Sequence, residues 1–308
     1  MINRTLIRLK IVQLVYAFYQ NGGKEINTAE KELMFSLAKA YDLYHYLLLL
    51  MVDITRYETE CIENQEQVNK IAHKDDDISH KFIDNRFVQQ LKNNIQLNEF
   101  AQNQKNSWMN DSDYLKKLIA DIKKTDTYKD YIENENDDYA TDREFWRKIY
   151  KSVIMKDDKI DEVLEDKSLY WNDDKEIVDT FVLKTIKRFQ EEEGENQELL
   201  PEFKDDEDRE FAIKLFRTTI INDYEYRQLI AQCVKNWEFD RLAFMDVVIM
   251  QIAIAEFLNF VQIPTTVTIN EYVDIAKYYS TPHSAAYVNG ILDAVLKKLR
   301  KDKLIIKK

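Results

Sequence analysis

Apolar side chains recur every three or four positions along most of the chain, which is the spacing of one face of an α-helix. No stretch shows the alternation of a half-buried β-strand, and the 308 residues include only 4 glycines and 3 prolines. We therefore predict an all-α protein. In the first part of the chain, the predicted helices span residues 3–20, about 27–61, 85–105 and 111–124.

Two consecutive helices are predicted near the C-terminus. Thr268 followed by Glu271 matches a capping box, so we expect the first helix to begin at Ile269. Pro282 separates the two helices, and Ser284 can cap the second one. The predicted buried face of the second helix consists of Val288, Ile291, Leu292, Val295 and Leu299.

Gly290 lies inside the second of these helices. A glycine in a helix interior costs about 1 kcal/mol relative to alanine. We therefore expect another backbone segment or a large side chain to pass close to Gly290.

Charge divides the chain into three parts. Residues 1–24 hold four basic and no acidic side chains, residues 25–208 hold 26 basic and 45 acidic ones, and residues 209–308 hold 14 and 11. We predict an N-terminal basic helix over 1–24, an acidic and mostly helical insertion over 25–208, and a C-terminal helical subdomain over 209–308. Within the insertion, residues 63–84 are predicted to form a loop and residues 191–208 an acidic linker.

The insertion contains a candidate internal repeat. Residues 143–189 can be aligned with residues 209–257, since Arg-Glu-Phe begins both segments and Trp171 pairs with Trp237. Two interpretations remain open. The first segment is a degenerate second copy of the helical unit, or the match is a chance similarity between amphipathic helices.

The sequence contains no arrangement that predicts catalysis, a metal site or a cofactor. It has no glycine-rich phosphate loop, no zinc-protease motif and no nucleophile elbow. Cys61 and Cys233 lie far apart, and we expect reduced thiols. The longest apolar run, residues 47–52, is too short to cross a bilayer, and the N-terminus does not resemble a signal peptide. We expect a cytoplasmic, non-enzymatic protein that does not enter the membrane.

Two stretches resemble the C-terminal signature of the NusB family. They are Ile-Pro-x-x-Val-x-Ile-Asn-Glu-x-Val-x-Ile-Ala-Lys over residues 263–277 and Tyr-Val-Asn-Gly-Ile-Leu-Asp over residues 287–293. The basic N-terminal helix is similar to that of the family, with the Gln-x-x-Tyr spacing at residues 13–16. The resemblance covers roughly residues 1–22 and 209–300. It implies a NusB-like bundle of two small helical subdomains, interrupted here by a long inserted helical region.

The resemblance also implies a function, because NusB proteins act in transcription antitermination. They bind boxA-type single-stranded RNA together with the ribosomal protein NusE, in a transcription complex with RNA polymerase, during ribosomal RNA transcription. Single-stranded RNA is held by basic groups on phosphates and by aromatic rings on splayed bases. By resemblance, the RNA-binding residues are Arg4, Arg8, Tyr16, His283, Ser284 and Tyr287, and the acidic contacts to NusE are Asp240 and Asp246.

The chain departs from the family pattern at several positions. Gln251 replaces an arginine, Ser280 a glycine and His283 an acidic residue, and the N-terminal arginine cluster is thinner. The thinner cluster predicts weaker RNA binding, or greater dependence on the partner. The alternative is a helical interaction scaffold that has lost RNA binding and docks proteins through the insertion, whereas nothing in the sequence supports an enzyme. A further hypothesis is that the acidic insertion covers the RNA surface.

Overall fold

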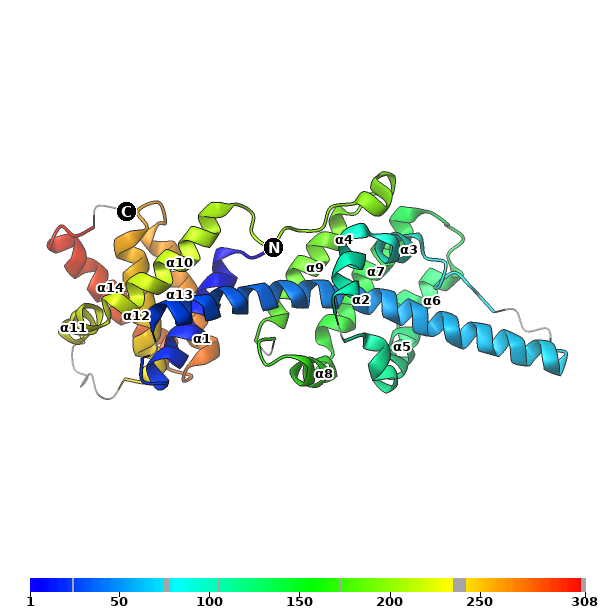
Figure 1. The fold of residues 1–308 in the computed structure, drawn as a ribbon, viewed down its shortest axis with the longest axis horizontal. Coiled ribbons are helices and arrows are strands. Elements are labelled where there is room, and N and C mark those ends of the chain that lie inside the picture. Colours follow the sequence, from blue (N-terminus) through cyan, green and yellow to red (C-terminus); the bar gives the residue numbers. More distant parts are fainter. Residues whose placement is uncertain (24, 75–77, 105, 172, 235–241, 306–308) are drawn as a thin grey trace. The chain divides into compact units, whose positions relative to one another are not determined.

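The computed structural model describes residues 1–23, 25–74, 78–104, 106–171, 173–234 and 242–305. The chain divides into two compact units. The terminal unit comprises residues 2–38 and 203–308, and the middle unit comprises Met1 and residues 39–202. Within the described ranges every regular element is a helix, and the β-contacts amount to one isolated bridge between Ile2 and Phe203 (Figure 1). The prediction of an all-α protein is confirmed.

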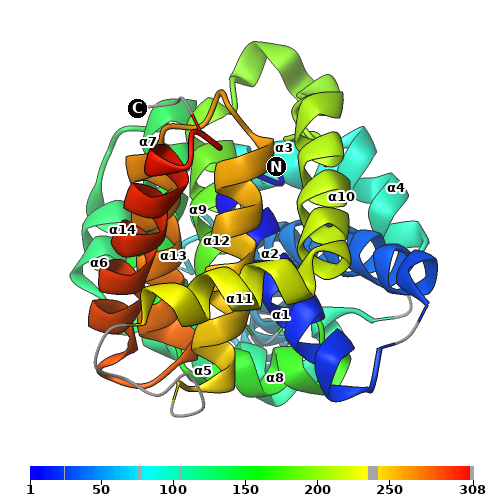
Figure 2. The same ribbon diagram turned by 90° about the vertical axis from the view of Figure 1, so that its left-hand side faces the viewer.

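The terminal unit is a bundle around α12 (Phe244–Asn259). Every residue from Asp246 to Phe257 is buried, so α12 lacks the polar face of a surface helix and forms the core. Figure 2 shows the other helices of the unit around it. Those that pack on α12 are α1 (Arg4–Gln20), α10 (Asp206–Ile221), α11 (Asp223–Cys233), α13 (Thr265–Tyr279) and α14 (Ser284–Lys301).

The middle unit contains most of α2 (Ile26–Ala72), which begins in the terminal unit, and a set of shorter helices. Large aromatic side chains fill its core. Trp108 and Tyr46 stack with ring centroids 4.5 Å apart, and the indole of Trp108 donates a hydrogen bond to the carbonyl of Tyr46 at 2.8 Å. The shorter α-helices are α3 (Arg86–Asn93), α4 (Ile95–Gln102), α5 (Ser112–Lys124), α6 (Asp126–Glu133), α7 (Tyr139–Ser152), α8 (Lys159–Lys167) and α9 (Lys175–Arg188). The 3₁₀ turns are η1 (Trp108–Asp111), η2 (Ile154–Lys156) and η3 (Glu191–Asn196).

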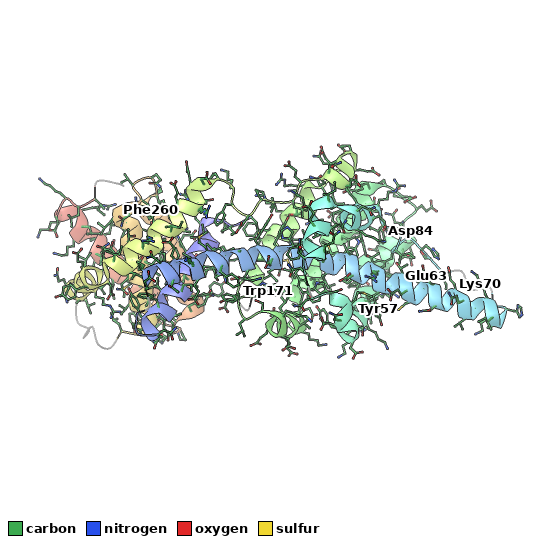
Figure 3. All side chains as sticks on the ribbon, viewed as in Figure 1. Tyr57, Glu63, Lys70, Asp84, Trp171 and Phe260 are labelled. Carbon is green, nitrogen blue, oxygen red and sulfur yellow. The ribbon has the colours of Figure 1, made fainter. Side chains whose placement is uncertain are left out.

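Helix α2 is longer than the hydrophobic pattern predicts. Residues 63–72, expected to belong to a loop, continue the helix to Ala72. This segment contains neither glycine nor proline, and its Glu, Gln and Lys residues are good helix formers. In Figure 3, Glu63 and Lys70 lie where α2 extends beyond the other helices of the middle unit. Because little packs against this end, no apolar stripe marks it in the sequence.

The single helix predicted over residues 85–105 is divided into α3 and α4. The break occurs at Asn94, whose backbone is extended (φ −62°, ψ 126°). The Asn94 side chain then caps α4 by accepting a hydrogen bond from the Leu97 amide at 3.0 Å. A capping residue within an apolar pattern therefore ends one helix and starts another.

The predicted acidic linker over residues 191–208 belongs in large part to the middle unit. Leu199 and Leu200 are buried, and the Asn94 amide donates to the carbonyl of Gln197 at 2.7 Å. The unit boundary falls between residues 202 and 203. Apolar anchors and backbone hydrogen bonds hold this acidic segment in place.

Helix α13 begins earlier than the capping-box pattern predicts. It starts at Thr265, directly after Pro264, rather than at Ile269. Thr268 is buried within the helix, and its hydroxyl donates to Glu256 Oε1 at 2.8 Å. The predicted start is wrong because Thr268 serves a tertiary contact and not a cap.

Gly290 does not mark a close approach. It is exposed on α14, and a Cβ atom added there would have no heavy atom within 4 Å outside its own helical turn. The expectation of a crowded neighbour is therefore wrong, and Gly290 is an open helical position.

The two segments of the candidate repeat have the same order of helices. Residues 143–189 contain α7, α8 and α9, and residues 209–257 contain α10, α11 and α12. In each segment the first helix packs on the third. Trp237 lies outside the described residues, so the matched tryptophans cannot be compared. The repeat stays a prediction.

We expect Gly290→Ala to raise the free energy of unfolding by about 0.5–1 kcal/mol, because alanine costs less conformational entropy in an open helix interior. The matched control is Gly22→Ala. Gly22 has a φ of +73°, so alanine there is expected to lower the free energy of unfolding by about 1 kcal/mol. Urea denaturation followed by circular dichroism measures both. A destabilising Gly290→Ala would contradict the open surroundings of this position.

Candidate nucleic-acid interface

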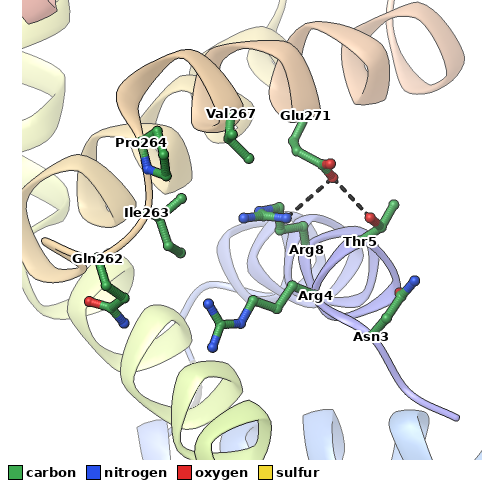
Figure 4. Close-up of a pocket in the computed structure, with 9 residues that line it drawn as sticks. All are labelled: Asn3, Arg4, Thr5, Arg8, Gln262, Ile263, Pro264, Val267 and Glu271. Carbon is green, nitrogen blue, oxygen red and sulfur yellow. Dashed lines mark hydrogen bonds and ion pairs between the residues drawn. The ribbon is translucent and has the colours of Figure 1, made fainter. Parts of the chain in front are cut away.

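Arg8 is a buried charge where α1 meets α12 and α13, and its side chain is only 3% exposed. The guanidinium donates from Nε to Glu256 Oε2 at 2.8 Å and from Nη2 to Glu256 Oε1 at 2.9 Å. Its Nη1 lies 3.2 Å from Glu271 Oε2 (Figure 4). The paired bonds to one carboxylate give this contact both strength and a fixed geometry.

Glu256 is fully buried and accepts further hydrogen bonds from α13. Thr268 Oγ1 donates at 2.8 Å and the Tyr272 hydroxyl at 3.0 Å. Both carboxylate oxygens are thus satisfied without water. Burial by itself would lower the pKa of Arg8, but the hydrogen bond to Glu256 and the surrounding acidic groups outweigh burial, so the pKa of Arg8 is raised.

Arg4, the first residue of α1, is the more accessible of the two arginines, with a side chain that is 30% exposed. Its Nε donates to Asp208 Oδ1 at 2.9 Å, and its Nη2 lies 3.9 Å from Glu207. The guanidinium lies over the ring of Phe211, 5.1 Å from the centroid. Arg4 is therefore held by the first turns of α10 but keeps access to solvent.

A cavity of about 320 Å³ opens beside Arg4 (Figure 4). On the α1 side it is bordered by polar groups, including Thr5, whose hydroxyl donates to Glu271 at 3.0 Å. On the α13 side it is bordered mainly by apolar groups. The lining residues are Asn3, Arg4, Thr5, Arg8, Gln262, Ile263, Pro264, Val267 and Glu271.

Tyr16 lies three turns further along α1. Its half-exposed ring packs 5.4 Å from the ring of Phe244 at the start of α12. The guanidinium of Arg227, from α11, lies 5.7 Å from the centroid of the same Phe244 ring and pairs with Asp223 at 2.7 Å. An accessible cation therefore shares an aromatic neighbour with Tyr16.

His283 and Ser284 lie at the start of α14 but differ in solvent exposure. His283 is exposed, whereas Ser284 is buried and its hydroxyl donates to Asp246 Oδ2 at 2.8 Å. The same hydroxyl oxygen accepts from the Thr281 amide at 3.1 Å. Ser284 thus fixes the loop between α13 and α14. Tyr287, one turn further on, is half-exposed.

The predicted site residues fall into accessible and buried groups. The accessible ones are Arg4, Tyr16, His283 and Tyr287. Arg8 and Ser284 were expected on the RNA surface, but both are buried with their polar atoms bound to protein groups. Asp246, an expected partner contact, is also buried, at 2% exposure. Asp240 lies outside the described residues.

Comparison with known proteins identifies the family. The model of the NusB family matches residues 180–297. The chain is 36% identical over 121 residues to the transcription antitermination protein NusB of Salinibacter ruber, covering 37% of this chain and 76% of that protein.

The chain belongs to the NusB family.

Other NusB proteins match over shorter parts of their length. The NusB of Chloroherpeton thalassium is 41% identical over 92 residues, which cover 30% of this chain and 44% of that protein. The NusB of Koribacter versatilis is 38% identical over 95 residues, which cover 31% of this chain and 65% of that protein. No solved structure matches this chain.

The NusB match differs in extent from the expected coverage of residues 1–22 and 209–300. It begins at residue 180, within α9, and so includes residues assigned above to the insertion. Residues 1–22 lie outside it. Even so, α1 packs against α10 and α12, so the N-terminal helix is part of the same unit as the signature helices.

In the described ranges, no group of three or more His, Cys, Asp or Glu side chains is placed to hold a metal ion. None of the described helices is both long enough and apolar enough to cross a membrane.

Three charged residues of the interface were not assigned from the sequence: Glu256, Asp208 and Arg227. Glu256 is the single acidic residue in the apolar run of α12 after Asp246, and an isolated charge in a buried helix signals a buried partner. Asp208 and Arg227 stand among other charged residues, so the sequence carried no comparable signal for them.

We expect Arg8→Ala to lower the free energy of unfolding by about 3–5 kcal/mol, because Glu256 would stay buried without its counter-charge. Replacing both partners, as Arg8→Met with Glu256→Gln, should recover much of that loss. The control is Arg4→Ala, whose partly exposed ion pair is worth less than about 1 kcal/mol. Urea unfolding measures all three variants. Equal losses from Arg8→Ala and Arg4→Ala would contradict the central role of the buried pair.

Proposed function

We propose that this NusB-family protein is a transcription antitermination factor. It would bind boxA-type single-stranded RNA together with NusE, in a transcription complex with RNA polymerase, during ribosomal RNA transcription. The observation that carries the proposal is the family match across α10–α14, with relatives named as transcription antitermination proteins. The protein would act by binding and not by catalysis.

The RNA surface in this proposal combines an accessible cation with half-exposed rings. Arg4 would contact a backbone phosphate, and Tyr16, His283 and Tyr287 would stack on or hydrogen-bond to bases. Arg227 adds a second cation near Tyr16. The charge balance of the terminal unit supports this assignment, since it holds 20 basic and 18 acidic residues while residues 39–202 hold 24 and 38.

Arg8 and Ser284, the buried residues of the predicted RNA-binding set, would act by holding other parts of the RNA surface in position. Arg8 holds α1 against α12 and α13, and Ser284 holds the loop before α14 through Asp246. In this proposal the acidic contact to NusE, a basic ribosomal protein, falls to Asp240. Such a charge at the edge of an interface mainly speeds the encounter and selects the partner.

One observation favours a second candidate, the interaction scaffold that does not bind RNA. Arg4 and Arg8 are both paired with carboxylates of the protein itself. RNA would have to displace Asp208 from Arg4. The scaffold would bind proteins in the presence of NusE but give no RNA complex, so a direct RNA titration separates the two functions.

We expect a labelled boxA-like single-stranded RNA to bind the wild type more tightly when NusE is present, and Arg4→Ala to weaken that binding. Fluorescence anisotropy at several salt concentrations measures it. Loss of one phosphate contact should reduce the slope of log affinity against log salt by about 0.7. The matched control is Arg56→Ala, an exposed and paired arginine of the middle unit. No RNA binding by the wild type with NusE would leave the scaffold function.

We expect Asp208→Asn to strengthen RNA binding by up to about fivefold, because a partly exposed ion pair that RNA must break is worth about 0.2–1 kcal/mol. The same anisotropy titration measures the effect. The double variant Arg4→Ala/Asp208→Asn should bind no better than Arg4→Ala. A gain in affinity that persists without Arg4 would mean that Asp208 repels RNA directly, not that it competes for Arg4.

A further inference from the structure

Tyr278, near the end of α13, exposes 72% of its surface to solvent. Among the described residues, none makes a hydrogen bond or a ring contact with it. Its neighbours Asp274, Lys277 and Thr281 are also exposed, and Lys277 pairs with Asp274 at 2.6 Å. Tyr278 is therefore a large and mostly exposed ring beside polar groups, and no hydrogen bond or ring contact among the described residues accounts for its position.

The position of Tyr278 on α13 places it beside the proposed RNA surface. It follows Glu271 by seven residues, so the two lie on the same face of the helix. Glu271 contacts α1 through Thr5 and Arg8, and the next residue after Tyr278, Tyr279, accepts a hydrogen bond from Gln13 of α1 at 3.0 Å. Tyr278 thus lies at the edge of the side of α13 that contacts α1, with its own ring exposed to solvent.

The same part of the unit carries two of the proposed base contacts. Tyr16 follows Gln13 by one turn of α1, and the exposed His283 follows Tyr278 after the short connection from α13 to α14. An exposed ring in this place adds a flat π-face to a surface that already holds Tyr16 and His283.

We propose that Tyr278 forms a nucleobase-binding subsite, on which one unstacked base of the bound single-stranded RNA stacks. Base stacking on an aromatic side chain tolerates any base, because every base has a π-face. The local charges suit this role, because the Lys277–Asp274 ion pair adds no net charge beside the ring. The phosphates of the RNA would then be bound by cations at other positions, such as Arg4. This subsite rests on the RNA-binding function proposed above.

A base fits these surroundings better than a protein side chain does. An aromatic residue that anchors a protein partner is normally surrounded by contacts that exclude water from it. The polar, solvated groups around Tyr278 would not exclude water from a protein contact at this ring. A base, by contrast, can stack on the ring while its polar edges stay in water.

The test compares Tyr278→Ala, Tyr278→Leu and Tyr278→Phe with the wild type, using the full chain, NusE and a boxA-like single-stranded RNA in anisotropy titrations. We expect alanine to weaken binding by about 5- to 100-fold and phenylalanine to change it little, since the π-face is kept. Leucine, which keeps apolar area without a π-face, should resemble alanine. The salt slope should stay that of the wild type, unlike the slope of Arg4→Ala.

Tyr224→Ala is the matched control, because Tyr224 is 74% exposed on α11. It should bind RNA as the wild type does, and 2-aminopurine placed along the RNA should show stacking that only the Tyr278 variants remove. Wild-type affinity in Tyr278→Ala, or an equal loss in Tyr224→Ala, would overturn the subsite and leave the proposed function standing. If Tyr278→Ala bound NusE more weakly in the absence of RNA, Tyr278 would be a contact for the protein partner and not a base-binding subsite. If the wild type binds no RNA, the proposed function itself fails.

Discussion

The buried ion pair between Arg8 and Glu256 is the constraint on which the terminal unit depends. Removing two such charges from water costs several kcal/mol for each ion. The pair is tolerable because Glu256 receives two hydrogen bonds from Arg8 and one each from Thr268 and Tyr272. These groups come from α1, α12 and α13, so the charges are satisfied only when the three helices meet in one arrangement. Because any other arrangement of the three helices would leave a buried charge unpaired, the ion pair selects this arrangement over alternatives.

This arrangement determines which side chains of α1 remain accessible to solvent. With Arg8 turned into the core, Arg4 and Tyr16 remain at opposite parts of the helix, one beside α10 and the other beside α12. A basic N-terminal helix is therefore not a uniform cationic surface. Its inward arginine positions the helix, and its accessible arginine is the one that a phosphate could reach.

The sequence predicts the helices of this chain well and the roles of its polar residues poorly. Helical spacing located α1 almost to the residue, because its apolar face is regular. The same reasoning misplaced the start of α13, since Thr268 has the residue type of a cap but donates its hydroxyl hydrogen bond to Glu256, twelve residues earlier in the chain. The end of α2 was missed because an exposed helix has no apolar stripe to detect. Local patterns report which face is apolar, whereas the partner of a buried polar group depends on tertiary packing.

The net charge of −12 shows why local geometry matters more than totals for an RNA interface. At physiological salt, exposed charges further apart than a Debye length of about 8 Å are largely screened from one another. The carboxylate of Asp208 lies 2.9 Å from Arg4, well inside that distance, so it competes directly with any phosphate for this cation. The acidic excess belongs entirely to residues 39–202, a separate compact unit, because the terminal unit holds slightly more basic than acidic residues. Under the proposed function, the affinity of the terminal unit for RNA would therefore depend less on the acidic composition of the chain than on how readily Arg4 exchanges the carboxylate of Asp208 for a phosphate.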